Sequence, residues 1–257
     1  MADEMRAGGV ESAEAEARWI VQAVDDSEGD DAALEMMRRR IAGEPLQYVL
    51  GCAAFRRLEL AVGPGVFIPR PETELVAERA MKRLPRDGIV VDLCSGSGAI
   101  ALSIADERPD ARVFATERSR RALEWAVRNR EAHGLDVTLC EGDLFEGLPQ
   151  DLSGRVDVVV ANPPYVDEAE TSLVARDVIE NEPADALFAP GRGTSVIERI
   201  VAAAPEWLRQ EGWLVTEIGE TQGAAAGDLL RSAGYADVDV LQDLTGRDRI
   251  AEGRAAR

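Results

Sequence analysis

The chain has 257 residues, 46% of them hydrophobic, which is enough to bury the core of one large domain or of a standard domain with a small one attached. Its 48 acidic and 29 basic side chains give a formal net charge of −19, which disfavours binding to a phosphate backbone. Three scattered cysteines and a single histidine, His133, argue against a disulfide framework, a metal site and a histidine-dependent nucleophile.

The sequence contains no sign of a membrane segment or of an export signal. No apolar run approaches the length of about 20 residues that a membrane helix needs. The first sixteen residues are acidic and rich in alanine, and they lack the basic start and the apolar stretch of a signal peptide. We therefore expect a cytoplasmic protein that does not associate with a membrane.

Residues 13–42 are predicted to form two short helices. An apolar stripe that begins at Trp19 marks the first helix, and apolar residues spaced i, i+3, i+7 from Leu34 to Ile41 mark the second. The acidic segment 25–31 between them contains a glycine and is typical of a loop. This pattern predicts a small helical module at the N-terminus.

The residues that follow predict a β-hairpin. Gly43–Pro45 ends the second helix. Residues 55–62 alternate between apolar and polar side chains and predict a strand. The segment Gly63–Gly65 then predicts a turn, and residues 66–68 predict a second short strand. Two prolines in residues 69–71 end this hairpin.

From residue 72 onward, predicted helices alternate with predicted strands. The apolar runs predict strands at 89–93, 112–116, 137–139, 156–161, 213–217, 236–241 and 249–252. The amphipathic segments predict helices at 72–84, 97–105, 120–133, 196–208 and 221–232. Repeated strand–helix units imply an α/β fold whose mostly parallel sheet carries helices on both faces.

A glycine-rich turn follows the strand at 89–93. Its sequence, Asp92-Leu93-Cys94-Ser95-Gly96-Ser97-Gly98, places two glycines where the backbone can approach a ligand closely at a helix N-terminus. Glu117 ends the next strand, where an acidic side chain can accept hydrogen bonds from both ribose hydroxyls of a nucleoside. These features are shared by NAD and S-adenosylmethionine sites, so the turn alone leaves both cofactors open.

Two further acidic residues favour S-adenosylmethionine. Asp92 is expected near the positively charged amino-acid part of that molecule, whereas it would repel a dinucleotide pyrophosphate. Asp143 follows the third strand and could accept a hydrogen bond from the adenine amino group, with Leu144 against the ring. An ordinary loop cap would also suit Asp143.

The most specific motif is Asn162-Pro163-Pro164-Tyr165, directly after the apolar strand 156–161. Ligands of such sheets bind beyond the carboxyl ends of the strands, so this motif should face the methyl donor. Its two prolines stiffen the backbone and remove two amide donors, which leaves carbonyl oxygens as acceptors. Asn162 adds a side-chain acceptor, and Tyr165 adds an aromatic face.

Such a set of groups suits a planar NH₂ group that is conjugated to a carbonyl or a ring. The Asn162 side-chain oxygen and the Pro163 carbonyl can hold the two N–H bonds and aim the nitrogen at the methyl carbon. Positioning of this kind can supply roughly 7–11 kcal/mol of the barrier. A general base is then not required, in agreement with the single histidine.

Together, the glycine-rich turn, Glu117, Asp143 and the Asn162–Tyr165 motif resemble class I methyltransferases of the amino-methylating branch. Within that branch the chain closely resembles the protein-(glutamine-N5) methyltransferases of the HemK/PrmC family. The resemblance covers nearly the whole chain from about Gly43, and the segments that carry it are Gly43–Gly51, Phe67–Glu74, Glu182-Pro183, Ala186-Leu187 and Asp248-Arg249.

The resemblance implies a Rossmann-like fold with a mostly parallel seven-stranded sheet. It also implies three parts: a helical substrate-recognition domain at 1–50, a β-hairpin linker at 51–71 and an S-adenosylmethionine-dependent methyltransferase domain at 72–257. The implied reaction is methylation of the glutamine side-chain amide in the Gly-Gly-Gln motif of peptide chain release factors. A sister group of the family acts on a ribosomal protein, which leaves that substrate as an alternative.

The resemblance also implies roles for individual residues. Asn162, Pro163 and Tyr165 are expected to be catalytic, and together with Pro164 they are expected to bind the substrate amide. The residues expected to bind S-adenosylmethionine are Phe67, Arg70, Asp92, Cys94, Ser95, Gly96, Ser97, Gly98, Glu117, Asp143, Leu144 and Asn162.

Four positions depart from the family pattern. Cys94 replaces the first glycine of the donor loop, and Glu117 replaces an aspartate. Leu144 stands where an aromatic residue often lies against the adenine, and Ile179 stands where an arginine is expected before Glu182-Pro183. These departures bear on the identity of the protein substrate more than on the chemistry.

The other hypotheses explain fewer of these features. Adenine-N6 methylation of nucleic acid uses a similar Asn-Pro-Pro-Tyr element, but base extrusion calls for a basic cleft and a target-recognition region. A non-catalytic binding module would not need the intact motif. Peptide chain release factors are therefore the expected partners, and nucleic acid is disfavoured.

Overall fold

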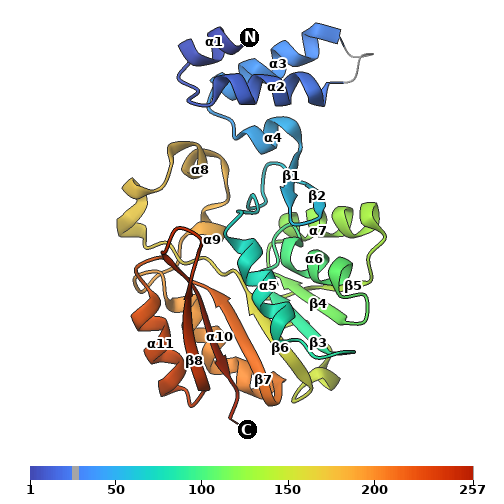
Figure 1. Cartoon of the computed structure of the whole chain (residues 1–257), viewed down its shortest axis with the longest axis vertical. Coiled ribbons are helices and arrows are strands. Elements are labelled where there is room, and N and C mark those ends of the chain that lie inside the picture. The colour runs from blue at the N-terminus through green and yellow to red at the C-terminus, as the bar shows by residue number, and fades with distance from the viewer. Residues whose placement is uncertain (25–28, 257) are drawn as a thin grey trace.

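The computed structural model describes residues 1–24 and 29–256 of the chain. A small group of helices at the N-terminus stands above a larger α/β body, and the C-terminus lies at the opposite end of that body (Figure 1). The body is built on one sheet with the strand order β5-β4-β3-β6-β7-β9-β8. This architecture confirms the predicted class I methyltransferase fold.

The seven strands of this sheet are mostly parallel. The pairs β3–β4, β4–β5, β3–β6 and β6–β7 run parallel, whereas β9 runs antiparallel to both β7 and β8. The strands are β3 (Ile89–Leu93), β4 (Arg112–Glu117), β5 (Val137–Glu141), β6 (Val156–Ala161), β7 (Leu208–Glu217), β8 (Ala236–Gln242) and β9 (Asp248–Arg254). Strands β3 and β6 have the predicted bounds, while β7 begins five residues earlier than predicted because polar residues precede its apolar half.

Helices cover both faces of the sheet, as predicted. Alternate residues of β3 enter two different cores, since successive side chains of a strand point to opposite faces. Val90 packs with residues of α5 and α6, whereas Val91 and Leu93 pack with residues of α10 and α11. The helices of the body are α5 (Thr73–Arg83), α6 (Ala99–Glu107), α7 (Arg120–His133), α10 (Ser195–Trp207) and α11 (Gly223–Ser232).

The N-terminal helices form a core of their own. Helices α2 (Ala13–Ala23) and α3 (Gly29–Ile41) confirm the two predicted helices, but α1 (Ala2–Ala7) was not predicted. A six-residue helix is too short to be stable alone, and α1 is held by Met5, which is fully buried against the other two. Trp19 does not lie on the buried face, because its side chain is 51% exposed. Part of the predicted loop 25–31 lies outside the described residues, and its last three residues belong to α3.

A hairpin is present, but the predicted positions of its strands and of its turn were wrong. The strands are β1 (Cys52–Phe55) and β2 (Leu58–Ala61), so the turn falls at Arg56-Arg57. Arg56 has a left-handed backbone (φ 51°), and its guanidinium binds Glu107 across the molecule. The turn therefore depends on long-range ion pairing, which no local pattern reveals. Residues 66–68 form no strand.

Short helices complete the chain. They are α4 (Leu46–Leu50), α8 (Arg176–Asn181) and α9 (Ala184–Leu187), together with the 3₁₀ segments Gln150–Leu152 and Glu168–Leu173. Helix α4 leads from the N-terminal helices into the hairpin, and the hydroxyl of its Tyr48 donates a hydrogen bond to the Val66 carbonyl at 2.5 Å. Among the described residues, no helix is both long and apolar enough to cross a membrane.

A buried carboxylate attaches α5 to the sheet. The Glu252 side chain, on β9, is fully buried and accepts hydrogen bonds from Arg79 (2.5 and 2.7 Å) and from Arg83 (2.5 Å). Burial opposes ionisation, but the hydrogen bonds from the two arginines hold the pKa of Glu252 below its usual value. Helix α5 therefore has a fixed position on the sheet, which matters because its first residue, Thr73, lines the site described below.

We expect Glu252→Gln to lower the free energy of unfolding by about 2–3 kcal/mol at neutral pH, since charge-assisted hydrogen bonds are lost from a buried group. Because the folded pKa of Glu252 is lowered, its contribution is present above the unfolded pKa and is lost as the pH falls through the folded value. Urea unfolding at several pH values measures both effects. Glu211→Gln, at an exposed partner of Arg254, is the matched control, and an equal effect of the two substitutions would contradict the expectation.

Candidate functional site

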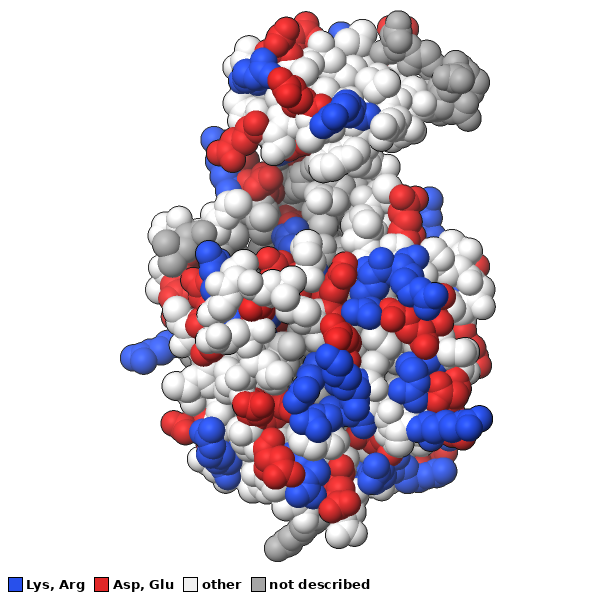
Figure 2. Space-filling view, viewed as in Figure 1, with Lys and Arg blue, Asp and Glu red and all other residues white. Residues whose placement is uncertain are grey.

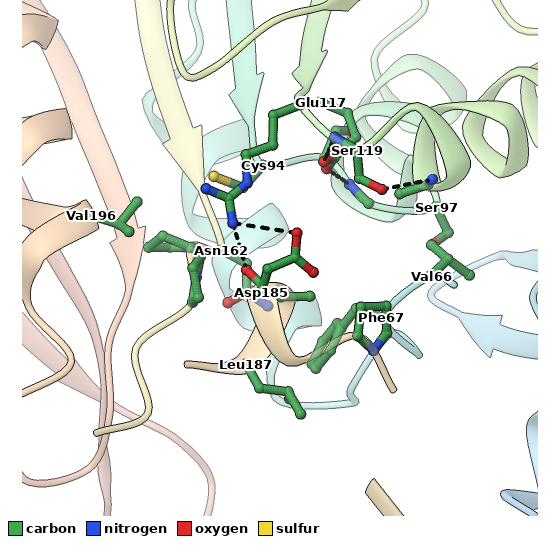
Figure 3. Close-up of a pocket in the computed structure, with 18 of the residues that line it drawn as sticks. Val66, Phe67, Cys94, Ser97, Glu117, Ser119, Asn162, Asp185, Leu187 and Val196 are labelled. Carbon is green, nitrogen blue, oxygen red and sulfur yellow. Dashed lines mark hydrogen bonds and ion pairs between the residues drawn. The ribbon is translucent and has the colours of Figure 1, made fainter. Parts of the chain in front are cut away.

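One cavity lies at the carboxyl ends of the parallel strands, which is where ligands of open α/β sheets bind (Figure 3). Glu117, Asn162 and Phe67 reach it from three different elements, the ends of β4 and β6 and the segment before α5. The expected site residues that line this cavity are Phe67, Cys94, Ser95, Gly96, Ser97, Glu117, Asp143, Leu144, Asn162, Pro163, Pro164 and Tyr165.

The glycine-rich turn needs a left-handed backbone at three alternate positions. Cys94, Gly96 and Gly98 have φ values of 58°, 58° and 86°. A Cβ atom at Gly98 would lie 2.9 Å from the Leu102 side chain, so packing accounts for that glycine, which does not line the cavity. A Cβ atom at Gly96 would meet nothing within 4 Å, which leaves room for a ligand.

Cys94 occupies its left-handed position at a cost. A residue with a Cβ atom loses about 1–2 kcal/mol in this conformation relative to the right-handed one, which is the physical reason for a glycine there. Burial raises the pKa of the Cys94 thiol, so the side chain is a neutral part of the wall and no nucleophile.

Glu117 holds the turn in place. Its carboxylate accepts hydrogen bonds from the backbone N–H groups of Gly96 and Ser119, both at 2.8 Å. Burial raises the pKa of this carboxylate, although the two backbone bonds oppose that shift. Each carboxylate oxygen has a second acceptor position, so Glu117 retains the capacity to accept hydrogen bonds from a ligand's hydroxyls.

Asn162 is oriented by a chain of hydrogen bonds. Its side-chain nitrogen donates to the Thr73 hydroxyl at 3.1 Å, and that hydroxyl donates to Glu217 at 2.6 Å. The Tyr165 hydroxyl donates to the other oxygen of Glu217 at 3.0 Å. Because the NH₂ end of the Asn162 side chain is turned to Thr73, the amide presents its oxygen on the other side, as an acceptor for a ligand.

The sequence reasoning missed both Thr73 and Glu217 as members of this network. Glu217 ends β7, which runs parallel and adjacent to β6. The rule that ligands bind at the carboxyl ends of strands, applied to β7, would have indicated it. Thr73 begins α5 and was noticed only as part of a family segment.

The backbone after Asn162 is rigidly supported. The Gln222 side chain donates to the Tyr165 carbonyl at 2.9 Å and accepts from the Gly219 N–H at 2.9 Å. A Cβ atom at Gly193 would lie 2.0 Å from the same Tyr165 carbonyl, so only glycine fits there. Burial raises the pKa of Tyr165, which keeps its phenol neutral and able to donate.

The sequence of this chain is similar to those of known methyltransferases. Residues 62–223 match the family model described as "Methyltransferase small domain". The chain is 43% identical over 246 residues to the release factor glutamine methyltransferase of Streptomyces coelicolor, covering 93% of this chain and 86% of that protein. It is 38% identical over 261 residues to that of Geobacter sulfurreducens, covering 96% and 91%.

The chain belongs to the release factor glutamine methyltransferase family. The family predicted from the sequence motifs is thereby confirmed.

Solved structures agree on the fold. A methyltransferase from Pyrococcus furiosus has a TM-score of 0.60 at 17% identity, covering 86% of this chain and 98% of that one. A T. thermophilus 16S rRNA methyltransferase in complex with AdoMet and guanosine has a TM-score of 0.57 at 22% identity, covering 79% and 49%. At these identities the likeness concerns the fold alone.

In this member of the release factor glutamine methyltransferase family, Asp92 lies under the glycine-rich turn and is not among the residues that line the cavity, so its contact with the methyl donor stays a prediction. One oxygen of its fully buried carboxylate accepts from the Ser95 hydroxyl at 2.6 Å and from the Ala101 N–H at 3.2 Å. The other oxygen has no hydrogen-bond partner within the described residues. Burial raises the pKa of Asp92 to about 7. Its place in the structure is that of a residue that shapes the turn.

Arg70 also lies off the cavity wall. Its guanidinium sits 4.7 Å from the centre of the Phe67 ring and pairs with Glu182, whose side chain is fully buried. Glu182 also accepts a hydrogen bond from the Ile68 backbone at 3.0 Å. Arg70 thus contacts Phe67, which does line the cavity, and its predicted role in binding the methyl donor stays a prediction.

Asp143 and Leu144 follow the end of β5 and line the cavity. The Asp143 carboxylate pairs with Arg199 at 2.7 Å, a partner that the sequence reasoning did not identify. Leu144 is buried, and its left-handed backbone (φ 55°) turns the chain after β5. Both residues are in place to contact the same ligand as Gly96.

Proposed function

We propose that this chain transfers a methyl group from S-adenosylmethionine to the side-chain amide nitrogen of a glutamine in the Gly-Gly-Gln motif of peptide chain release factors. The observation that carries the proposal is the orientation of Asn162: its side-chain nitrogen donates to Thr73, and both Asn162 and Pro163 line the cavity. The names of the relatives, which cover most of this chain, support the same substrate.

The residues around the glycine-rich turn fit S-adenosylmethionine. The open space at Gly96 admits a ligand close to the backbone, and Glu117 offers a carboxylate to the ribose hydroxyls. Leu144 supplies an apolar surface for the adenine, with Asp143 beside it. When bound, S-adenosylmethionine supplies an electrophilic methyl group on a sulfonium sulfur, which keeps the electron pair of the broken carbon–sulfur bond.

The substrate amide is a poor nucleophile, because its nitrogen lone pair is delocalised into the carbonyl. The Asn162 oxygen and the Pro163 carbonyl accept its two N–H bonds and aim the nitrogen at the methyl carbon. As the new nitrogen–carbon bond forms, the nitrogen gives up one proton to water and becomes a neutral N-methyl amide. Tyr165, which lines the cavity, packs against the amide plane.

We infer three functional parts in the chain: residues 1–50 for protein recognition, 51–71 as a linker and 72–257 for methyl transfer. Asn181 on α8 donates a hydrogen bond to the Gly43 carbonyl at 3.2 Å, which connects the first part to the rim of the catalytic part. The cytoplasm, where translation takes place, is the proposed location.

We expect deletion of residues 1–42 to slow methylation of an intact release factor while leaving the affinity for S-adenosylmethionine unchanged, because the core of α1–α3 is separate from the sheet. Methylation rates and calorimetric titrations with S-adenosylmethionine, for the full chain and for the chain without residues 1–42, measure the two effects. Equal rates on the intact protein substrate would contradict a recognition role for the N-terminal helices.

Charge on the surface favours a protein substrate over nucleic acid. On the face shown in Figure 2, Lys and Arg side chains are interspersed with Asp and Glu side chains, and the described residues there form no continuous basic surface. Together with the net charge of −19, this arrangement disfavours a phosphate backbone.

The test is transfer of radiolabelled methyl from S-adenosylmethionine to a purified release factor. A matched release factor with its motif glutamine replaced by alanine is the control. The proposal predicts label on the unmodified protein only. Label on both proteins would assign the reaction to another side chain, and label on neither, with donor binding intact, would refute release factors as the substrate.

A further inference from the structure

We propose that Glu217 decides which end of the Asn162 side-chain amide faces the cavity, acting through the Thr73 hydroxyl, so that the site is competent only while Glu217 is ionised. This inference rests on the proposed function, because it concerns how the same site binds the side-chain amide of the substrate glutamine. Glu217 is a positioning residue, since it touches Thr73 and Tyr165 and does not line the cavity.

The direction of the hydrogen bonds follows from the chemistry of the three groups. An ionised carboxylate can only accept, so the Thr73 hydroxyl must donate its single hydrogen to Glu217, at 2.6 Å. The Thr73 oxygen is then available only as an acceptor toward Asn162, at 3.1 Å. Asn162 must therefore present its nitrogen to Thr73, and its oxygen remains for the N–H bonds of the substrate.

The same carboxylate controls a second residue of the motif. Its other oxygen accepts from the Tyr165 hydroxyl at 3.0 Å, so Glu217 orders Asn162 and Tyr165 at once. Glu217 is 1% exposed, and thus water does not compete for these bonds. Its place at the end of β7, beside β6, brings it under the motif that follows β6.

Protonation of Glu217 would reverse the direction of the hydrogen bonds that link it to Thr73 and Asn162. A protonated carboxyl group donates its hydrogen, and if it donates to Thr73, the Thr73 hydroxyl turns toward Asn162. Asn162 then presents its oxygen to Thr73 and its NH₂ group to the cavity. Two NH₂ groups, one from Asn162 and one from the substrate, would face each other, and the nitrogen would no longer be held.

The surroundings of Glu217 place this change near neutral pH. Burial raises the pKa of Glu217 to about 7, against the hydrogen bonds from Thr73 and Tyr165 and the charge of Arg249 on β9, while Glu72 before α5 adds to the rise. Arg249 itself pairs with Asp243 at 3.4 Å. Because the ionised form is the competent one, kcat should rise as the pH increases through this region.

The experiment compares kcat from about pH 5.5 to about pH 8.5 for the unmodified chain, Glu217→Gln, Thr73→Val and Thr73→Ser, with both substrates saturating. Glu217→Gln cannot titrate and can accept from only one of its two donors, so its kcat should be lower and its pH profile should lose the rise that Glu217 causes. Thr73→Val should lower kcat roughly 10- to 100-fold without changing the affinity for S-adenosylmethionine, and Thr73→Ser should restore it. Thr138→Val, on the exposed face of β5, is the matched control.

A kcat in Thr73→Val equal to that of the unmodified chain would overturn the inference. So would a pH profile that Glu217→Gln leaves unchanged, since a merely structural role of Glu217 would not alter the profile. An unmodified chain that binds S-adenosylmethionine but methylates no release factor at any pH would instead refute the proposed function, and the inference with it.

Discussion

Replacing Asn162 by alanine is expected to lower kcat on the order of 10²–10³-fold, by analogy with the loss of one preorganised hydrogen-bonding group from an active site. The substitution removes the oxygen that accepts a substrate N–H bond, and it leaves Thr73 and Glu217 bonded to each other. The fold and the affinity for S-adenosylmethionine should change little, because Asn162 is only partly buried and follows the end of β6. Single-turnover methylation of a release factor measures the loss directly.

The control for this experiment is Gln150→Ala, since Gln150 is exposed and does not line the cavity. Circular dichroism and thermal unfolding establish that both variants are folded. If the Asn162 variant methylates at the unmodified rate, the amide nitrogen is held by other groups and the proposed mechanism is wrong. If both the methylation rate and the affinity for S-adenosylmethionine fall in this variant, Asn162 contributes to binding of the methyl donor.

The second large effect is expected from Glu117→Ala, which should weaken S-adenosylmethionine binding roughly 10- to 150-fold. The figure follows from losing charge-assisted hydrogen bonds of about 1.5–3 kcal/mol. Part of the loss comes from the proposed ribose contact and part from the turn, because Gly96 and Ser119 lose their acceptor. Isothermal titration with S-adenosylmethionine and with S-adenosylhomocysteine measures the dissociation constants.

Glu141→Ala is a closely matched control, because Glu141 lies opposite Glu117 in the register of β4 and β5 but is exposed. At saturating donor, kcat of the Glu117 variant should remain within a few-fold of the unmodified value, since the carboxylate does not touch the reacting nitrogen. Unchanged dissociation constants, or a loss confined to kcat, would assign Glu117 another role.

The sequence predicted the structure correctly wherever a structural feature depends on residues that are close together in the chain. The mostly apolar run 156–161 predicts β6 with its observed bounds, and the amphipathic segment 120–133 does the same for α7. The alternation of such segments predicts the parallel sheet, and the sheet in turn places Glu117 and Asn162 at one edge. Local periodicity and the carboxyl-end rule were sufficient for these elements.

Local patterns were misleading where distant residues set the conformation. The hairpin turn was predicted at Gly63–Gly65, but it falls at Arg56, whose side chain binds Glu107 on α6. The hydrogen bonds of Asp92 to Ser95 and Ala101 beneath the turn were not predicted either. In each case the missing information is the position of a polar partner that only packing brings within hydrogen-bond distance.

The amino-acid sequence alone was enough to establish the family and the fold, because both depend on residue types at short, regular spacing. The orientation of Asn162 could be known only from the folded chain. It depends on Thr73 and Glu217, which are 89 and 55 positions away in the sequence and meet because α5 and β7 pack beside β6. Hydrogen-bond direction is a property of three groups in contact, and no linear pattern encodes it.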